Sequence, residues 1–170
     1  MKIKVKLFDK ECKFEFIKKG EWIDLRAAED ITIEGPHSLI LDRTTNKRKV
    51  VFSTYNISLG IGMKLPEGIE AHILPRSSTY KDWFIMMRNS EGIIDSSYSG
   101  PNDQWKFAAI AMDTANIKKG DKICQFRIEV SQKATIWQKI KWLFTNKIKF
   151  EFVDDYNGED RGGFGSTGKN

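Results

Sequence analysis

Alternation of polar and apolar side chains is the feature of this 170-residue chain that most limits its possible folds. Lysines occupy positions 2, 4 and 6, and aliphatic residues occupy positions 3, 5 and 7. The alternation returns in short runs at 69–74 and 148–152, which are separated from their neighbours by turns. A side-chain period of two is typical of half-buried strands. Many short strands of this kind predict an all-β sandwich or barrel.

One segment has helical rather than strand periodicity. In residues 133–150, apolar side chains at 136, 137, 140, 143 and 144 recur at helical spacing among lysines. We therefore expect a short helical insertion at about 134–148. Its apolar face either packs on the β-core of the assembly or forms a docking surface for a protein partner. Membrane-surface binding is less favoured, because the helix is short and its polar face is modest.

Composition narrows the functional classes. Hydrophobic residues make up 40% and charged residues 30% of the chain, which indicates a globular protein. The net charge of +5 is compatible with anionic ligands such as nucleotides but too small to indicate nucleic-acid binding. Two cysteines and no membrane-length apolar run favour a soluble intracellular protein that does not bind a membrane. Two histidines and two cysteines without close spacing argue against structural zinc.

Residues 91–100 predict a hairpin that meets a ligand. Two isoleucines lead into a turn at Asp95, and Tyr98 follows three residues later. The unpaired backbone groups of such a tip can read the edge of a flat polar ligand, and the amide of Asn89 can both donate and accept. The alternative is an ordinary hairpin in which Asp95 is a turn former.

Three further segments carry polar side chains in apolar surroundings. Arg76 is followed by Ser77 and Ser78, which indicates an anion cradle or, alternatively, a serine-rich surface loop. Asp24 lies between apolar neighbours and suits either a site rim or a solvated strand position. Gln125 interrupts an apolar strand, where it would orient a water or face solvent.

The chain divides into a β domain at 1–153 and a flexible Gly-rich arm at 154–170. The arm places Arg161 and Phe164 among Gly, Ser and Thr. A ring can stack on a base while N–H groups, hydroxyls and a guanidinium bind phosphates. The alternative is a disordered tail without function.

Taken in order, these segments resemble the five motifs of the homotrimeric deoxyuridine triphosphatases (dUTP pyrophosphatases). The matching residues are 24–27, 75–78, 92–98, 120–125 and 161–168. The resemblance implies a jelly-roll-like β fold, a homotrimer with shared active sites, and Mg²⁺. It implies hydrolysis of dUTP to dUMP and pyrophosphate, which keeps uracil out of DNA and supplies dUMP for thymidylate synthesis.

The resemblance also assigns roles. Asp95 would be the general base, and Gln125 would help to place the attacking water. Asp24 would contact a Mg²⁺-bound water rather than the ion. The implied substrate-binding residues, in chain order, are Arg76, Ser77, Ser78, Asn89, Gly92, Ile94, Tyr98, Arg161, Phe164, Gly165, Ser166 and Thr167. The hairpin would read uracil and exclude a 2′-OH, 76–78 would hold phosphates, and the arm would close over a neighbour's site.

The chain departs from the family pattern in three places. Trp22 and Ile23 stand where a small Gly is usual, and the spacing from Arg161 to Phe164 is two residues shorter than usual. The insertion before the fifth motif suggests a phage-type member.

Two alternatives to a dUTP pyrophosphatase stay open. A dCTP deaminase shares the fold but needs a Glu in the strand after the third motif, and 105–112 contains none. A nucleotide-sensing regulatory protein is the alternative outside enzymology.

Overall fold

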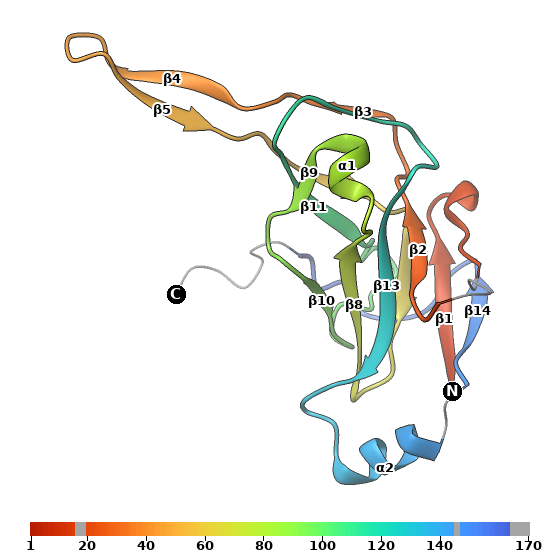
Figure 1. Cartoon of the computed structure of the whole chain (residues 1–170). Helices are drawn as coiled ribbons and strands as arrows, with labels where there is room; N and C mark the ends of the chain where they lie inside the picture. Colours follow the sequence, from red (N-terminus) through yellow and green to blue (C-terminus); the bar gives the residue numbers. More distant parts are fainter. Residues whose placement is uncertain (16–19, 145–146, 164–170) are drawn as a thin grey trace.

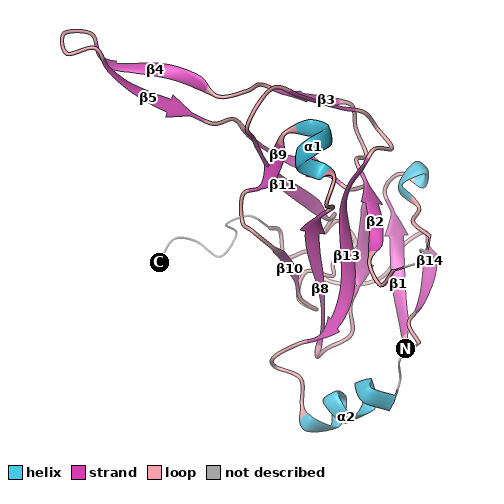
Figure 2. Cartoon of the chain, in the orientation of Figure 1, coloured by secondary structure: helices cyan, strands magenta, loops and turns pink. Residues whose placement is uncertain are grey.

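The computed structural model describes residues 1–15, 20–144 and 147–163. The strands are β1 (Lys2–Leu7), β2 (Ile23–Arg26), β3 (Ile31–Ile33), β4 (His37–Asp42), β5 (Lys47–Val51), β6 (Thr54–Ser58), β7 (Ile61–Lys64), β8 (Ile69–Pro75), β9 (Ile85–Met87), β10 (Gly92–Ile94), β11 (Lys106–Ala111), β12 (Ala115–Ile117), β13 (Lys122–Val130) and β14 (Lys149–Val153). The helices are α1 (Thr79–Trp83) and α2 (Ile136–Phe144), with one 3₁₀ turn at Lys10–Cys12. The predicted all-β class is confirmed (Figure 2).

The described strands form five sheets, and all of them except the β4-β5 hairpin contribute buried side chains to the core. The largest has the strand order β10-β8-β13-β2, two others have the orders β14-β1-β7 and β6-β11-β9, and β12 pairs with β3. β1 shows how alternation produces this arrangement, because Ile3 and Val5 are fully buried while Lys2 and Lys4 are exposed. β14 pairs in parallel with β1, so the C-terminal strand lies beside the N-terminal one (Figure 1).

The two ends of the β10-β8-β13-β2 sheet are marked by the two α-helices. α1 follows β8 at one end, and α2 follows β13 beyond the other end (Figure 1). β4 and β5 form a hairpin that projects away from this body, and residues 43–48 around its tip are exposed (Figure 1). The chain leaves the hairpin after β5, so β5 and β6 are separate strands.

Two local features were not predicted from the sequence. Residues 10–12 form a 3₁₀ turn, and 13–15 are irregular. Phe14 is buried there for a tertiary reason, since its ring packs edge-on against Phe126 and Phe150 at centroid distances of 5.3 and 5.1 Å. The five-residue helix α1 was not predicted, because so short a helix has no periodicity to detect.

Helix α2 forms inside the predicted range of 134–148, but its apolar face does not pack on the β-core of its own chain. Ile136, Trp137, Leu143 and Phe144 are each at least 70% exposed. The opposite side makes the contact, since the amide of Gln138 donates to the carbonyl of Glu67 (3.1 Å). Gln138 and Trp142 are spaced by four residues and share that side of the helix. Packing of the apolar face on a neighbouring subunit stays a prediction.

Candidate functional site

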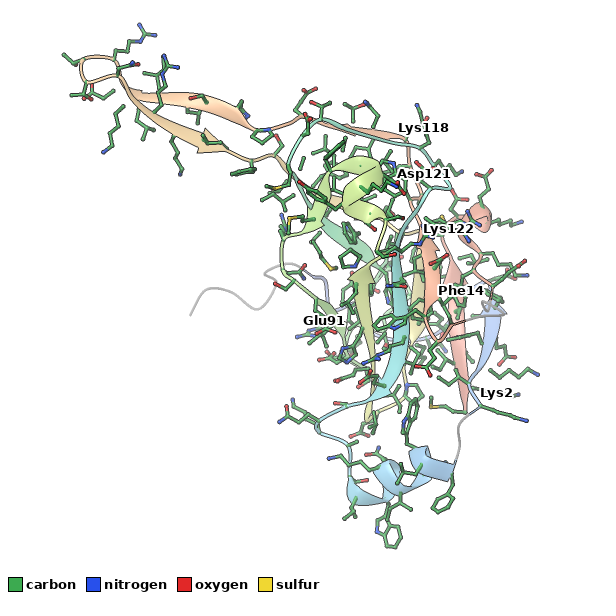
Figure 3. All side chains as sticks on the ribbon, viewed as in Figure 1. Lys2, Phe14, Glu91, Lys118, Asp121 and Lys122 are labelled. Carbon is green, nitrogen blue, oxygen red and sulfur yellow. The ribbon has the colours of Figure 1, made fainter. Side chains whose placement is uncertain are left out.

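An ion-pair cluster at the α1 end of the large sheet joins the first, second and fourth motifs. Asp24 on β2 places Oδ1 3.0 Å from Nε of Arg76 and Oδ2 3.2 Å from Nζ of Lys122. Nη1 of Arg76 donates to the carbonyl of Lys122 (2.9 Å). Lys122 lies at the end of β13 that faces α1 (Figure 3). The cluster keeps two cations on the rim of the sheet, which suits an anionic ligand.

Thr79 fixes the backbone of this cluster. It is fully buried, its hydroxyl accepts the N–H of Arg76 (2.9 Å), and the hydroxyl donates to the carbonyl of Ile123 (2.8 Å). Gln125 is half-buried beside it and donates to the carbonyl of Pro75 (3.2 Å). Of these residues, Thr79 and Lys122 were missed by sequence reasoning, since neither residue type is distinctive without knowledge of the strand pairing.

The predicted hairpin turn at Asp95 is present. The N–H of Tyr98 donates to the carbonyl of Asp95 (3.1 Å), and the N–H of Ser97 donates to the Asp95 carboxylate (2.9 Å). Partial burial raises the pKa of Asp95, but the hydroxyl and N–H of Ser97 and the nearby Arg161 outweigh it and hold the pKa below its usual value. Asp95 is therefore ionised at neutral pH, as a general base must be.

The hairpin residues that are expected to read uracil differ in their exposure. Asn89 is exposed, and Gly92 pairs with Ile73 at the start of β10. Ile94 is buried and points into the core, so only its backbone can face a ligand. Tyr98 is half-buried, and its hydroxyl donates to the carbonyl of Gln104 (2.8 Å), which fixes the ring.

The two predicted catalytic residues are not brought together within one chain. Gln125 pairs with Leu74 near the α1 end of β8, whereas Ile94, just before Asp95, pairs with Ala71. Three strand positions separate Ala71 from Leu74, and at ~3.3 Å per residue this is about 10 Å, with Asp95 lying further still along β8. Asp95 with Tyr98 and the Asp24–Arg76–Gln125 set therefore form two separate half-sites.

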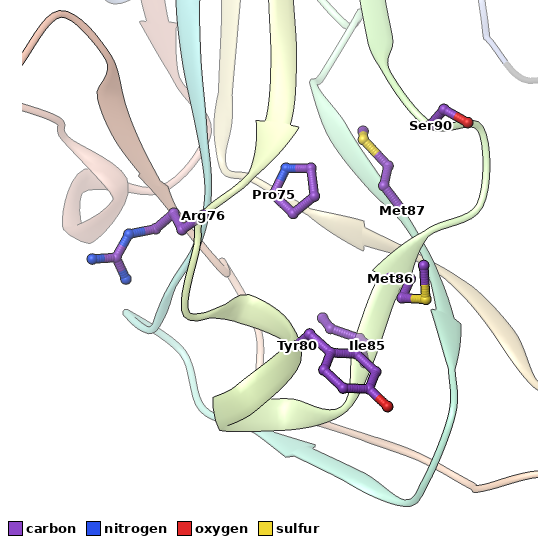
Figure 4. Close-up of a pocket in the computed structure, with 7 residues that line it drawn as sticks. All are labelled: Pro75, Arg76, Tyr80, Ile85, Met86, Met87 and Ser90. Atoms are coloured by element: carbon purple, nitrogen blue, oxygen red, sulfur yellow. The ribbon is translucent and has the colours of Figure 1, made fainter.

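A groove of about 560 Å³ lies between the second motif and the loop that leads into the hairpin. Pro75, Arg76, Tyr80, Ile85, Met86, Met87 and Ser90 line it (Figure 4). The Arg76 side chain points away from Met87 and Ser90 (Figure 4), so the groove is largely apolar and the cation stands at its edge. Ser77 is exposed and Ser78 half-buried at the start of α1.

The donor set fits an indirect metal contact. Among the described residues, no group of three or more His, Cys, Asp and Glu side chains is arranged to hold a metal ion. Asp24 is a single carboxylate that already pairs with Arg76 and Lys122. Such a set suits an ion that arrives chelated by phosphates and meets Asp24 through a water.

The arm is described only to Gly163, so the predictions for Phe164, Gly165, Ser166 and Thr167 lie outside the described residues. Arg161 is described, and its Nη1 lies 2.7 Å from Oγ of Ser97 and 3.3 Å from Oδ1 of Asp95. The guanidinium of Arg161 therefore lies at the hairpin turn and not at the ion-pair cluster of Arg76 and Lys122. In the part of the chain that the structure describes, no helix is long and apolar enough to cross a membrane.

Comparison with known proteins agrees with the motif pattern. A family model described as dUTPase matches residues 24–168. The SPbeta prophage-derived deoxyuridine 5′-triphosphate nucleotidohydrolase YosS of Bacillus subtilis (strain 168) is 42% identical over 169 residues, which cover 99% of each chain. A deoxyuridine 5′-triphosphate nucleotidohydrolase of Wolbachia pipientis wMel is 35% identical over 116 residues, which cover 66% of this chain and 67% of the relative.

Solved structures share the fold at low sequence identity. A dUTPase from Streptococcus mutans superposes with a TM-score of 0.60 at 17% identity and covers 75% of this chain and 91% of its own. A D95N mutant dUTPase from phage phi11 of S. aureus, whose structure reveals the coordination of a structural Mg(II) ion, has a TM-score of 0.60 at 16% identity. The match covers 79% of this chain and 94% of the phage chain. These similarities confirm the fold expected from the sequence.

Proposed function

Because the chain belongs to the dUTPase family, we propose that it hydrolyses dUTP to dUMP and pyrophosphate. The observation that carries the proposal is the hairpin turn, in which Ser97 holds an ionised Asp95 three residues before Tyr98. A carboxylate that stays ionised near a polar hairpin tip can accept a proton from water that attacks a phosphorus atom. Removal of dUTP and supply of dUMP follow from this reaction.

The roles of the two half-sites differ. We assign uracil to the backbone of Gly92 and Ile94 and to the amide of Asn89, and the deoxyribose to the Tyr98 ring. Unpaired backbone groups at a hairpin tip read the pattern of donors and acceptors on a base, and a fixed ring leaves no space for a 2′-OH. The phosphates belong to the other half-site, where Arg76 with Ser77 and Ser78 supplies donors.

A complete site needs a second copy of the chain. Asp95 lies more than about 10 Å along β8 from the strand position of Gln125, so one chain cannot place both on one attacking water. We therefore propose a homotrimer in which one subunit supplies Asp95 and a neighbour supplies Asp24, Arg76 and Gln125. Closed three-fold symmetry would repeat this shared site three times.

Mg²⁺ is assigned to the substrate rather than to a protein cage. When bound to the triphosphate it neutralises phosphate charge, which makes attack by water easier. Asp24 would hold a water of that ion, and Lys122 and Arg76 keep the Asp24 carboxylate oriented. Two free, buried cysteines support a cytoplasmic location.

A dCTP deaminase is the nearest alternative reaction. β11, the strand after the third motif, contains no Glu or Asp, so the proton carrier that deamination needs is missing from that strand. Hydrolysis is therefore the better-supported chemistry. The decisive assay measures pyrophosphate release from dUTP, dCTP, dTTP and UTP in parallel, with and without Mg²⁺, and monitors dCTP for conversion to dUTP.

Asp95→Asn tests the proposed base. The substitution keeps the size of the side chain and an acceptor for Ser97 but removes the proton acceptor, so kcat for dUTP should fall by roughly 10²–10⁴. Binding of dUTP should persist. Near-normal kcat in Asp95→Asn would show that another group accepts the proton.

The exposed face of α2 supports a second role, in protein binding. Residues 131–150 contain five lysines and no Asp or Glu, and Ile136, Trp137, Leu143 and Phe144 of α2 face solvent. We propose that this face binds an acidic amphipathic segment of a partner protein, because its charge complements the lysines. The same chain would then bind both a nucleotide and a protein partner, as a nucleotide-sensing regulatory protein does.

A synthetic acidic amphipathic peptide is the probe for this role. Its binding should need both its acidic and its apolar residues, and Trp137→Ala should abolish it without changing dUTP turnover. Binding of anionic lipid vesicles in preference to the peptide would assign the face to a membrane surface instead.

A further inference from the structure

One histidine of β8 is bonded to a carboxylate at each of its two ring nitrogens. Nδ1 of His72 lies 2.6 Å from Oε1 of Glu91, and Nε2 lies 3.1 Å from Oε1 of Glu70. The side chains of His72 and Glu70 are only 14% and 18% exposed, so water supplies little of their hydrogen bonding. A neutral imidazole has one N–H donor, whereas an imidazolium has two. The complete Glu70–His72–Glu91 bridge therefore needs a protonated His72.

The charged groups that face His72 come from three neighbouring parts of the chain. They are Glu70 on β8 itself, Glu91 directly before β10, and Arg127 and Glu129 on β13. Arg127 stands opposite His72 in the strand register and is ion-paired with Glu129. Burial lowers the pKa of His72, but the bonds to Glu91 and Glu70 and the charge of Glu129 outweigh burial and raise the pKa above its ordinary value. The bridge therefore persists to a higher pH than an ordinary histidine would allow.

Glu91 closes the tight turn that carries Asn89. The N–H of Ser90 donates to the carbonyl of Met87 (3.2 Å), and the N–H of Glu91 donates to the carbonyl of Asn89 (2.6 Å). Ser90 has a φ of +61°, a left-handed conformation that is costly for a residue other than glycine and persists only where its surroundings hold it. The bond from His72 supplies such a hold, because it attaches the end of the turn to β8, beside which Glu91 lies (Figure 3).

We propose that His72 is a positioning residue, which acts through Glu91 to fix the turn whose Asn89 amide distinguishes uracil from cytosine. This role rests on the proposed hydrolysis of dUTP and on the reading of uracil by Asn89. Uracil has a carbonyl oxygen where cytosine has an amino group, so an amide that is free to move discriminates less between them. Every group of the bridge lies in one chain, so the bridge does not depend on which subunits share a site.

Glu91→Gln tests the bridge with the least disturbance. The amide oxygen can still accept from Nδ1 of His72, but it carries no charge to attract the cation, so the turn is held less firmly. We expect the dUTP-to-dCTP ratio of kcat/KM to fall by about tenfold, mainly through KM for dUTP, because Asp95 and Gln125 are untouched. His72→Ala should lower the ratio at least as much. An unchanged ratio in Glu91→Gln would overturn the proposal, even if His72→Ala failed to fold.

The two substitutions should not add. Once His72→Ala has removed the bridge, Glu91→Gln has no bond to weaken, so the double variant should have the same dUTP-to-dCTP ratio as His72→Ala. Two side chains that stabilise the fold independently would instead give additive losses, and that result would overturn the proposal.

Glu70→Gln is the matched control, because Glu70 bonds the same imidazole but lies on β8 rather than in the turn. At low pH, where His72 is protonated, this variant should keep the wild-type KM for dUTP. As pH rises through the raised pKa, His72 loses its proton and the bridge weakens, so KM in the wild type should rise about threefold or more. In Glu70→Gln the rise should begin at lower pH, because a carboxylate that raises the pKa is gone.

Comparison of the two pH profiles removes the titration of dUTP itself, which is the same for both proteins. A rise in KM at the same pH in the wild type and in Glu70→Gln, or a rise in neither, would overturn the proposal.

Proton NMR of the free protein separates failure of this inference from failure of the proposed function. The chain has two histidines, and His37→Gln, in the exposed part of β4, identifies the His72 signal by elimination. The side-chain amide signals of Asn89 should shift with pH at the same midpoint as His72, and this midpoint should fall in Glu70→Gln and in Glu91→Gln. An Asn89 amide that does not follow His72 would overturn the positioning role, whether or not dUTP is the substrate. A coupled titration in a protein that does not hydrolyse dUTP would support the bridge and count against the proposed function alone.

Discussion

Nε of Arg76 lies 3.0 Å from Oδ1 of Asp24, and this ion pair joins the first motif on β2 to the second motif after β8, two strands that lie on either side of β13. The same guanidinium donates through Nη1 to the carbonyl of Lys122 (2.9 Å). Two partners therefore orient Arg76 before any phosphate arrives, which lowers the entropy lost on binding.

Arg76→Lys should weaken substrate binding despite keeping the charge. A lysine ammonium cannot satisfy the Asp24 carboxylate and the Lys122 carbonyl in the same planar geometry. We expect kcat/KM for dUTP to fall by about 10–100-fold, mainly through KM. Steady-state pyrophosphate release measures this, with Arg88→Lys at an exposed site as the control. An unchanged KM would mean that Arg76 does not contact phosphate.

The acidic limb of the pH profile should report Asp95. Its pKa is lowered, so kcat/KM should stay level well below neutrality and fall only as pH drops through that pKa and the base is protonated. Ser97→Ala and Arg161→Ala should each move the limb to higher pH, and Ser97→Ala should move it further, because the Ser97 hydroxyl lowers the pKa more. Identical profiles in all three proteins would exclude Asp95 as the titrating base.

The two tryptophans of α2 should differ in their effect on stability. Trp142 packs against the core on the side that carries Gln138, so Trp142→Ala should cost roughly 1–3 kcal/mol, less than a fully buried Trp. Trp137 is 76% exposed, and its replacement should change the free energy of unfolding by less than about 0.5 kcal/mol. Denaturant unfolding of the assembly measures both. A large loss with Trp137→Ala would indicate that a neighbouring subunit covers this face.

Tyr98 should discriminate against UTP through its ring rather than its hydroxyl. The hydroxyl donates to the carbonyl of Gln104 and holds the half-buried ring in place. Tyr98→Ala should raise the UTP-to-dUTP ratio of kcat/KM by about tenfold or more, whereas Tyr98→Phe should change it little. Equal ratios in wild type and Tyr98→Ala would place sugar selection elsewhere.

The sequence alone was enough to predict the fold class, the family and many candidate site residues, because the patterns that indicate them are local. The alternation in β1, the turn at Asp95 and each one of the five motifs depend on residues within a few positions of one another. A period of two reports which face of a strand is buried, and a turn former reports a bend. The fold class, the family and the identity of most candidate site residues follow from such patterns.

Only the tertiary structure decided which of these residues meet. The register of β8 with β10 and β13 separates Asp95 from Gln125, and no local pattern encodes that register. Helix α2 contacts the body through the side that carries Gln138 and Trp142, and not through its more apolar side. Gln138 donates to the carbonyl of Glu67, and both Gln138 and Trp142 line the pocket beside Glu67. The hydrogen bond from the N–H of Arg161 to the buried Asp103 carboxylate spans 58 positions. Pairings over such separations arise from packing of the whole chain, so they are absent from any short stretch of sequence.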